Sequence, residues 1–350
     1  MTNSIEYSYF LGRQWDFIEF CTIAQEAERL GFSAIFHEDN LLNHDPAYPR
    51  YTPGFDVWTL MTALACVTKT IRIGSMATPA PRRFAPLLAK TVASLDVISN
   101  GRTIVGLGAG DDKEQFDMIG QTFPAEAKDR RALVRETLEV LRKCWTEDRA
   151  NYNGRFYTLR NAVTTPKCIQ KPSPPIWLCV NTSKKLMPFM AAELADALMV
   201  MWGNDETVAT VLDNFKTCWA ELGRDPSKMI AARFVFPIIC DEEEVRDWRS
   251  EFAQWTGHTI NYDEHHSTTT VPEDSDSCCF IVGTPAKIIA DIRERVLELG
   301  FNHICIMGFS LGRFAKQIDC GSLGRVAGNY LGSMRYIAEQ IIPELTEVSS

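Results

Sequence analysis

The chain has 350 residues and a mass of 39.5 kDa, and 45% of its residues are hydrophobic, 10% aromatic and 23% charged. These proportions are ordinary for a folded globular protein and exclude global disorder or a fibrous repeat. The chain carries 36 basic and 45 acidic residues, which give a formal charge of −9. Because phosphate groups need a basic face, this balance argues against nucleic acid or an anionic membrane as a partner.

The sequence also bears on the compartment. The opening MTNSIEYSYFLGRQW lacks the basic-then-apolar pattern of a secretory leader, and no stretch approaches about 18 apolar residues. The 11 cysteines are odd in number and irregularly spaced, and no two form a Cys-x-x-Cys pair. Neither a disulfide framework nor a common structural zinc site is therefore indicated. We expect a cytoplasmic protein without a resident metal.

Short apolar runs alternate along the chain with longer segments whose apolar residues recur at helical spacing. Strands are predicted at Ile5–Phe10, Phe32–Phe36, Ile71–Met76, Thr103–Leu107, Ile176–Val180, Ala197–Met201, Ile230–Ile239 and His303–Met307. Helices are predicted at Trp15–Leu30, Phe55–Thr68, Leu87–Ile98, Ala125–Thr146, Lys184–Leu194, Asp205–Leu222, Glu242–Trp255, Pro285–Leu299 and Leu323–Ile342.

Eight strands, nearly all followed by a helix, indicate parallel pairing through βαβ units. The chain length suits one (β/α)8 TIM barrel spanning residues 1–350, with a doubly wound open sheet as the alternative. Insertions at the C-terminal rim are expected at about 38–54, 148–175 and 240–280. The second contains a predicted hairpin that turns at Asn153-Gly154, and in the third the polar residues 256–279 are a candidate lid.

Polar side chains follow the second predicted strand. His37, Glu38, Asp39 and Asn40 come directly after it, and His44 lies shortly beyond. Because the chemistry of a TIM barrel lies at the carboxyl ends of its strands, Glu38, Asp39 and His44 are candidate acid–base residues. An ordinary solvated loop is the main alternative. A metal cluster is less favoured, since no HExxH or similar helical spacing is present.

A glycine-rich segment follows the fourth predicted strand, at Gly106-Leu107-Gly108-Ala109-Gly110. Glycines let the backbone approach a flat or phosphorylated ligand, although a tight strand-to-helix turn would also use them. Asp111 stands where the G-x-G-x-x-G fingerprint requires its third glycine, so a Rossmann dinucleotide site is not predicted. Asp111 is a further candidate acid–base residue.

Asn181, Thr182, Ser183 and Lys184 follow the fifth predicted strand and open a helix. A capping side chain, backbone N–H groups and the helix dipole can together bind an anion, and the lysine adds charge. A plain helix cap is the alternative. The chain contains neither GxxxxGK[ST] nor GxSxG, which argues against P-loop nucleotide chemistry and against an α/β-hydrolase.

Several of these stretches together resemble the bacterial luciferase-like family of flavin-dependent oxidoreductases. The most specific match runs from Leu88 through Ser94–Arg102 into Gly106–Gly110. Shorter matches follow the same order along the chain, at Ala24–Phe32, Gly154–Tyr157, Gln170–Ile176, Ala191–Ala197, Val282–Pro285 and Leu299–Phe301.

The resemblance implies a TIM barrel that binds FMN or the deazaflavin F420 at its C-terminal rim. It implies a non-proline cis peptide around Ser75-Met76, and a homodimer formed through the helices at 55–68 and 87–98. The implied cofactor contacts, for the ring, its side chain and its phosphate, are Ala77, Thr78, Gly108, Ala109, Gly110, Asn181, Thr182, Ser183, Lys184 and Trp202.

The main hypothesis is a monooxygenase that uses O2 and reduced FMN, supplied by a separate flavin reductase, on a small organic substrate. In the F420-dependent dehydrogenases of the family, a histidine follows the acidic residue after the second strand, whereas Asn40 follows Asp39 here. The G-P-K segment of many F420 enzymes is also replaced, by NTSKK at 181–185. These departures favour FMN. An F420-dependent oxidoreductase and a non-catalytic flavin-binding protein are the alternatives.

Overall fold

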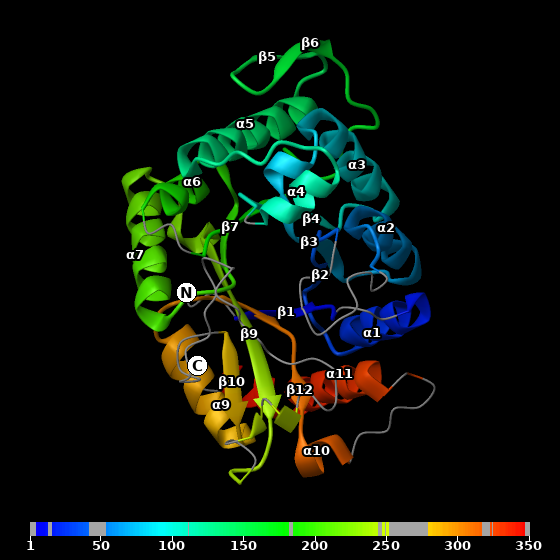
Figure 1. Cartoon of the computed structure of the whole chain (residues 1–350), viewed down its shortest axis with the longest axis vertical. Coiled ribbons are helices and arrows are strands. Elements are labelled where there is room, and N and C mark those ends of the chain that lie inside the picture. The colour runs from blue at the N-terminus through cyan, green and yellow to red at the C-terminus, as the bar shows by residue number, and fades with distance from the viewer. Residues whose placement is uncertain are drawn as a thin grey trace.

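Eight parallel strands form a closed barrel, surrounded by a ring of helices (Figure 1). The computed structural model describes residues 5–12, 16–41, 54–110, 112–181, 185–243, 247–248, 250–251, 279–316, 323 and 325–346. The strands follow one another around the barrel as β1-β2-β3-β4-β7-β8-β9-β11, and β11 pairs with β1 to close it. The predicted TIM barrel is confirmed, and the open sheet is excluded.

The barrel strands lie close to their predicted positions. They are β1 (Glu6–Phe10), β2 (Ala34–His37), β3 (Arg72–Pro79), β4 (Thr103–Gly108), β7 (Ile176–Cys179), β8 (Ala197–Val200), β9 (Ile230–Ile239) and β11 (His303–Ile306). The longer helices are α1 (Phe17–Arg29), α2 (Val57–Val67), α3 (Ala85–Ile98), α5 (Ala127–Thr146), α6 (Leu186–Leu194), α7 (Asp205–Glu221), α9 (Pro285–Ile292) and α11 (Arg325–Tyr336). The predicted helix at Glu242–Trp255 lies mostly outside the described residues.

Four elements were not predicted: the helix α4 (Lys113–Met118), the strands β10 (Phe280–Gly283) and β12 (Phe309–Ser310), and the helix α10 (Gly312–Lys316). The strands β10 and β12 both form by pairing with the far end of β9, which has ten residues. Its first half pairs with β8 and β11 inside the barrel, whereas Phe236–Ile239 continue beyond it and pair with β10. The end of β9 also pairs with β12. The final helix of the described chain is α12 (Ile342–Thr346).

The stretch 148–175 contains the predicted hairpin, formed by the antiparallel strands β5 (Ala150–Asn153) and β6 (Thr158–Ala162). Its turn spans residues 154–157 and is longer than the two-residue turn that was predicted. The hairpin projects beyond α5 in Figure 1. Because this stretch joins a helix to the next strand, it does not lie at a strand's carboxyl end, in contrast to the expected position at the C-terminal rim.

The connection between α2 and β3 is held by two charged side chains. The carboxylate of Glu28 accepts hydrogen bonds from the backbone N–H groups of residues 69, 70 and 71. The buried guanidinium of Arg102 donates to the carbonyls of Ala65, Thr68, Ile71 and Ser99. The negative carboxylate of Glu28 thus satisfies the N–H donors of this connection, and the positive guanidinium of Arg102 satisfies its carbonyl acceptors. Arg102, which belongs to the stretch that resembles the luciferase-like family, therefore has a structural role.

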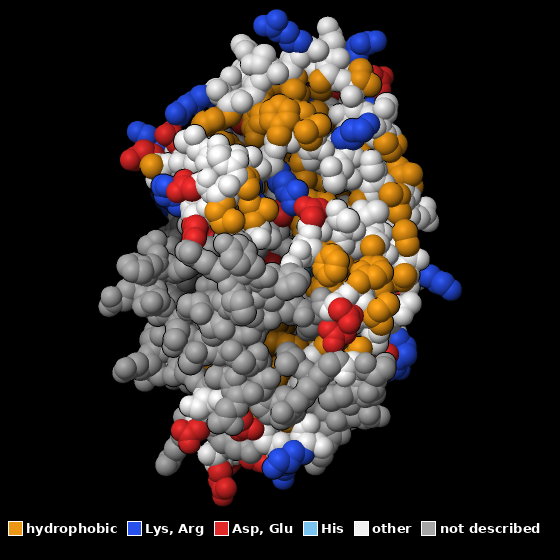
Figure 2. All heavy atoms as spheres, turned by 45° about the vertical axis from the view of Figure 1, so that its right-hand side comes forward, with side chains coloured by type: hydrophobic (Ala, Val, Ile, Leu, Met, Phe, Trp, Pro, Cys, Tyr) orange, Lys and Arg blue, Asp and Glu red, His pale blue; other side chains and the backbone are white. Residues whose placement is uncertain are grey.

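An apolar strip lies on the outer face of α3. Phe84, Leu87, Val97 and Ile98 are exposed by 58%, 64%, 40% and 51%. Figure 2, which brings this side of the molecule forward, shows hydrophobic side chains spread over the same side. The apolar residues of α2, by contrast, are buried within the chain itself. The homodimer stays a prediction, and it depends on α3 more than on α2.

Among the described residues, none of the helices has both the length and the apolar character required to cross a bilayer.

We expect Glu28→Gln to lower the free energy of unfolding by about 1–2 kcal/mol at neutral pH, because a charged acceptor of backbone hydrogen bonds becomes neutral. Burial raises the pKa of Glu28, but its hydrogen bonds outweigh this and lower the pKa from 4.5 to about 2. Because the pKa of Glu28 is lower in the folded protein than in the unfolded chain, its carboxylate stabilises the folded protein fully above pH 4.5, and this contribution is lost as the pH falls toward 2. The difference between the two proteins should therefore shrink from pH 4.5 toward pH 2.

Denaturant unfolding of both proteins across this pH range checks the prediction, with Glu298→Gln as the control because Glu298 is exposed at the end of its helix. A constant difference between wild type and Glu28→Gln at all pH values would contradict it.

If α3 pairs two copies, the double variant Leu87→Arg, Ile98→Arg should be monomeric, because two buried cations would face their symmetry mates. Light scattering at micromolar concentration measures the mass. Leu222→Arg is the matched control, since Leu222 is 42% exposed and follows α7, across the barrel from α3. A monomeric wild type would contradict the homodimer.

Candidate functional site

Three small residues at neighbouring strand ends form an accessible floor at the mouth of the barrel. Ala77 of β3, Gly108 of β4 and Cys179 of β7 are each partly exposed, whereas the other residues of β4 and β7 are buried. A Cβ built on Gly108 would lie 3.5 Å from Cβ of Ala77 and 4.0 Å from Cβ of Cys179. Ala77 and Cys179 therefore flank the space that a side chain of residue 108 would occupy, and a flat ring could lie over the three residues.

The three glycines of the 106–110 segment have different roles. A Cβ on Gly106 would lie 2.0 Å from the carbonyl oxygen of Ser75, so this glycine lets β3 and β4 approach closely. Gly110 has a φ of +72°, a conformation that L side chains rarely adopt. Gly108 has neither constraint, since its Cβ would make only ordinary contacts. Its lack of a side chain instead keeps the floor flat.

The floor includes a non-proline cis peptide bond. It joins Met76 to Ala77, one residue after the position that was expected. Thr78 follows, but it is fully buried, and its hydroxyl has no hydrogen-bond partner in the described part of the chain. Ala109 is partly exposed beside Gly108. Of the residues predicted to contact the cofactor ring, Ala77 and Gly108 therefore lie on the floor, and Thr78 is covered.

Asp39, which follows β2, forms ion pairs with two arginines. Nε and Nη2 of Arg83 donate to its two carboxylate oxygens at 3.0 and 2.5 Å, and Nη2 of Arg82 lies 3.1 Å away. Arg83 also pairs with Asp56 at 2.5 Å. Burial lowers the pKa of Arg83, but Asp39 and Asp56 outweigh this and raise it above its ordinary value. Asp39 thus fixes the loop after β3 to the loop after β2.

Gln115 of α4 joins the same two loops to the loop after β4. Its Oε1 accepts from Arg82 at 2.6 Å and from the backbone of Leu41 at 2.7 Å. Its Nε2 donates to Asp112 at 2.7 Å and to Asn40 at 3.4 Å. Three consecutive strand ends are therefore tied together beside the floor, which favours a preorganised site.

Glu38 lies on the mouth side of the same loop. Phe36, two residues earlier, points into the barrel and contacts Trp177 with ring centroids 5.2 Å apart. Glu38 directly follows the carboxyl end of β2, which places it at the mouth, and it is partly exposed. Nδ2 of Asn40 donates to its Oε2 at 3.0 Å. The other two predicted acid–base residues, His44 and Asp111, lie outside the described residues.

On the other side of the mouth, Asn181 positions the segment after β8. Its Oδ1 accepts from the backbone N–H groups of Met201 and Trp202 at 3.1 and 3.2 Å. Trp202 is partly exposed and contacts Phe234 of β9. Thr182, Ser183 and Lys184, predicted to hold the phosphate with Asn181, lie outside the described residues. The roles of all the predicted site residues stay predictions.

Sequence reasoning did not identify Arg82, Arg83, Gln115 or Cys179 as site residues. The two arginines are adjacent and follow the proline-rich end of the third predicted strand, which is a usable signal. Cys179 stands in the apolar run Ile176–Val180, a pattern that by itself indicates a small core residue. Its position as the last residue of a barrel strand could have identified it.

Comparison with known proteins gives the family. A family model described as luciferase-like monooxygenase matches residues 11–303. The F420-dependent glucose-6-phosphate dehydrogenase of Amycolatopsis mediterranei (strain U-32) is 25% identical over 313 residues, which cover 84% of this chain and 88% of that protein. The family predicted from the sequence is therefore confirmed, and with it an oxidoreductase.

Two solved structures show the same fold. An F420-dependent secondary alcohol dehydrogenase in complex with an F420-acetone adduct superposes with a TM-score of 0.75 at 22% identity, covering 98% of this chain and 99% of that one. Monooxygenase RslO1 from Streptomyces bottropensis gives 0.73 at 22% identity, with coverage of 97% and 99%. The relatives favour the F420 alternative over the FMN-dependent monooxygenase that was the main hypothesis.

Proposed function

The chain belongs to the luciferase-like monooxygenase family, and we propose that it is an F420-dependent oxidoreductase that interconverts an alcohol and a carbonyl compound. The observation that carries this proposal is the floor formed by Ala77, Gly108 and Cys179. Its small side chains suit a flat tricyclic ring, and the loops beside it are already fixed by the contacts of Asp39 and Gln115. The similarity to an F420-dependent relative supports F420 as the occupant.

Oxidation of an alcohol removes a hydride from its carbon and a proton from its hydroxyl group. F420, when bound, supplies the two-electron hydride acceptor. The protein must place the alcohol over the floor and accept the proton. Glu38 is suited to that task, because it lies at the mouth, is partly exposed and is oriented by Asn40. Asp39 has a positioning role, because its carboxylate is engaged by Arg82 and Arg83.

The FMN-dependent monooxygenase is kept as a second candidate, because a monooxygenase shares the fold over nearly the whole chain. A flat floor suits FMN as well as F420. Only this candidate needs O2 and a separate flavin reductase as a partner. A non-catalytic flavin-binding protein would have no need for an oriented carboxylate such as Glu38 at the mouth.

We expect the purified protein to bind F420 at least about tenfold more tightly than FMN, and to reduce F420 with an alcohol in the absence of oxygen. Fluorescence titration measures both affinities. Gly108→Val should weaken F420 binding by about tenfold or more. The Cβ of the valine fits between its neighbours, but its two γ-methyl groups project above the floor into the space that the ring would occupy.

Circular dichroism and thermal unfolding of Gly108→Val provide the control, and both should match the wild type. Tight binding of FMN together with oxygen-dependent turnover would contradict the proposal in favour of the monooxygenase. Equal F420 affinity of the wild type and Gly108→Val would show that the cofactor lies elsewhere.

We further expect Glu38→Gln to lower kcat by about 100-fold or more, because an amide cannot accept the hydroxyl proton. The affinity for F420 should stay within about twofold of the wild type, since no cofactor contact is removed. Glu126→Gln is the matched control, as Glu126 is exposed at the start of α5 and makes no capping hydrogen bond through its side chain. Unchanged turnover by Glu38→Gln would exclude it as the proton acceptor.

A further inference from the structure

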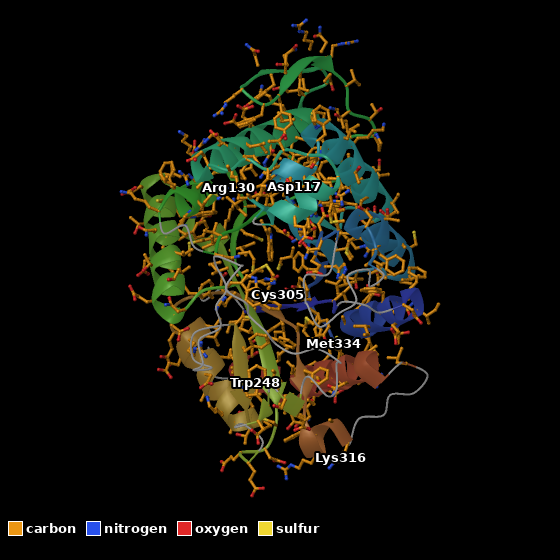
Figure 3. All side chains as sticks on the ribbon, in the orientation of Figure 1. Asp117, Arg130, Trp248, Cys305, Lys316 and Met334 are labelled. Atoms are coloured by element: carbon orange, nitrogen blue, oxygen red, sulfur yellow. The ribbon has the colours of Figure 1, made fainter. Side chains whose placement is uncertain are left out.

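The side of the barrel mouth opposite the floor is aromatic. Phe10 at the end of β1 contacts Phe234 of β9 edge to face, with ring centroids 5.4 Å apart. The strand β11 lies between β1 and β9, so two rings on these strands can meet only if both point into the barrel. Phe234 is also in register with Cys305 of β11, which lies near the centre of the helix ring in Figure 3.

Trp202 extends this wall toward the opening. Its ring centroid lies 6.1 Å from that of Phe234, and it is partly exposed whereas Phe10 and Phe234 are buried. We call Phe10, Phe234 and Trp202 the aromatic wall. In the barrel order β9 lies across from β3, and β1 lies across from β7, so Phe234 and Phe10 face the floor. Trp202 follows β8, the neighbour of β7, so its partly exposed indole lies at the edge where the wall meets the floor.

The backbone that carries Trp202 is fixed from two sides. Asn181 accepts from the N–H groups of Met201 and Trp202, and Nη1 of the buried Arg233 donates to the carbonyls of Val200 and Met201 at 3.1 and 2.7 Å. A large ring on a held backbone presents a fixed apolar surface at little cost in conformational entropy. Such a residue can select ligands by shape and polarity.

The arginines of the neighbouring loops are committed to the protein. Arg83 pairs with Asp39 and Asp56, and Arg82 with Asp39 and Gln115. A phosphate ester brings about two negative charges, and burying them requires cations that are not already neutralised. The described part of the mouth thus offers an aromatic surface and engaged arginines, a combination that suits an uncharged ligand.

We propose that the substrate of this site is an uncharged alcohol or ketone with an apolar body, and that Trp202, which the family resemblance assigns to the cofactor, instead selects this substrate. This inference rests on the proposed function. The alcohol carbon would transfer its hydride to oxidised F420 and its hydroxyl proton to a carboxylate, giving the ketone and reduced F420. The apolar body of the substrate would pack against Trp202.

The test uses the full chain and four compounds: 2-propanol, cyclohexanol, cyclohexanone and glucose 6-phosphate. Calorimetry with cyclohexanone measures binding without turnover, fluorescence titration measures F420 affinity, and anaerobic reduction of F420 gives kcat and KM. The variants are Trp202→Ala and Trp202→Phe. Phe156→Ala is the matched control, because Phe156 is also a partly exposed aromatic residue and lies in the turn between β5 and β6, away from the mouth.

We expect cyclohexanol to be preferred over glucose 6-phosphate by at least about tenfold in kcat/KM. Trp202→Ala should weaken cyclohexanone binding and raise KM for cyclohexanol by roughly tenfold, while F420 affinity stays within about twofold. Trp202→Phe should keep most of the affinity, which separates loss of the contact from misfolding. Phe156→Ala should behave as the wild type.

Preference for glucose 6-phosphate would overturn the substrate class. A parallel loss of F420 affinity in Trp202→Ala and Trp202→Phe would make Trp202 a cofactor contact and overturn its selecting role, as would unchanged ketone binding. If the wild type binds cyclohexanone through Trp202 but does not bind F420, the proposed cofactor is wrong, whereas the role of Trp202 in selecting the ligand is supported.

Discussion

Closure of the sheet is the constraint on which the rest of the molecule depends. Each of the eight strands has a neighbour on both sides, and all are parallel, so all eight carboxyl ends meet around one opening. Residues far apart in the sequence become neighbours there without any local signal. Arg83 is 44 positions from Asp39, yet two hydrogen bonds join them. The long strand β9 completes the closure and then leaves the barrel, so the same element that carries Phe234 also supports β10 and β12.

The two sides of the mouth differ in the size of their side chains. On the side of β3, β4 and β7, small residues leave a surface that a flat ring can cover, and the loops above them are held by charged and polar contacts. On the side of β1, β8 and β9, the surface is built from large rings in contact with one another, and hydrogen bonds from Asn181 and Arg233 fix the backbone at Trp202. On the proposed function, the small residues would accommodate the flat ring of F420, and the aromatic wall would meet the substrate. A substrate assignment is therefore better argued from the aromatic wall than from the floor.

The features predicted correctly from the sequence are those with a local cause. Each barrel strand is a short apolar run next to an amphipathic helix, and hydrophobic spacing alone indicates both. The strand β10 was missed because its four residues form a strand only where β9 extends beyond the barrel. The ion pairs of Asp39 could not be predicted from the sequence, because the two arginines that form them lie on another loop. The family resemblance assigned the predicted dimer contact to both α2 and α3, but most apolar residues of α2 are buried within the chain, whereas exposed apolar residues lie along α3. In each case the missing information was a tertiary contact.

The hydrogen bonds of Asn40 change the inference about the cofactor that was drawn from its sequence position. Its presence in place of the histidine expected from F420-dependent dehydrogenases favoured FMN when only the sequence was considered. In the structure, however, Nδ2 of Asn40 donates to Glu38 at 3.0 Å, while its Oδ1 accepts from Gln115 at 3.4 Å. An amide can do both at once, because it has a donor and an acceptor group on one planar end. Asn40 therefore orients a carboxylate two residues away, on the side of the loop that faces the mouth. On the proposed function, Glu38 serves as the proton acceptor without the histidine, so the substitution is compatible with hydride transfer to F420.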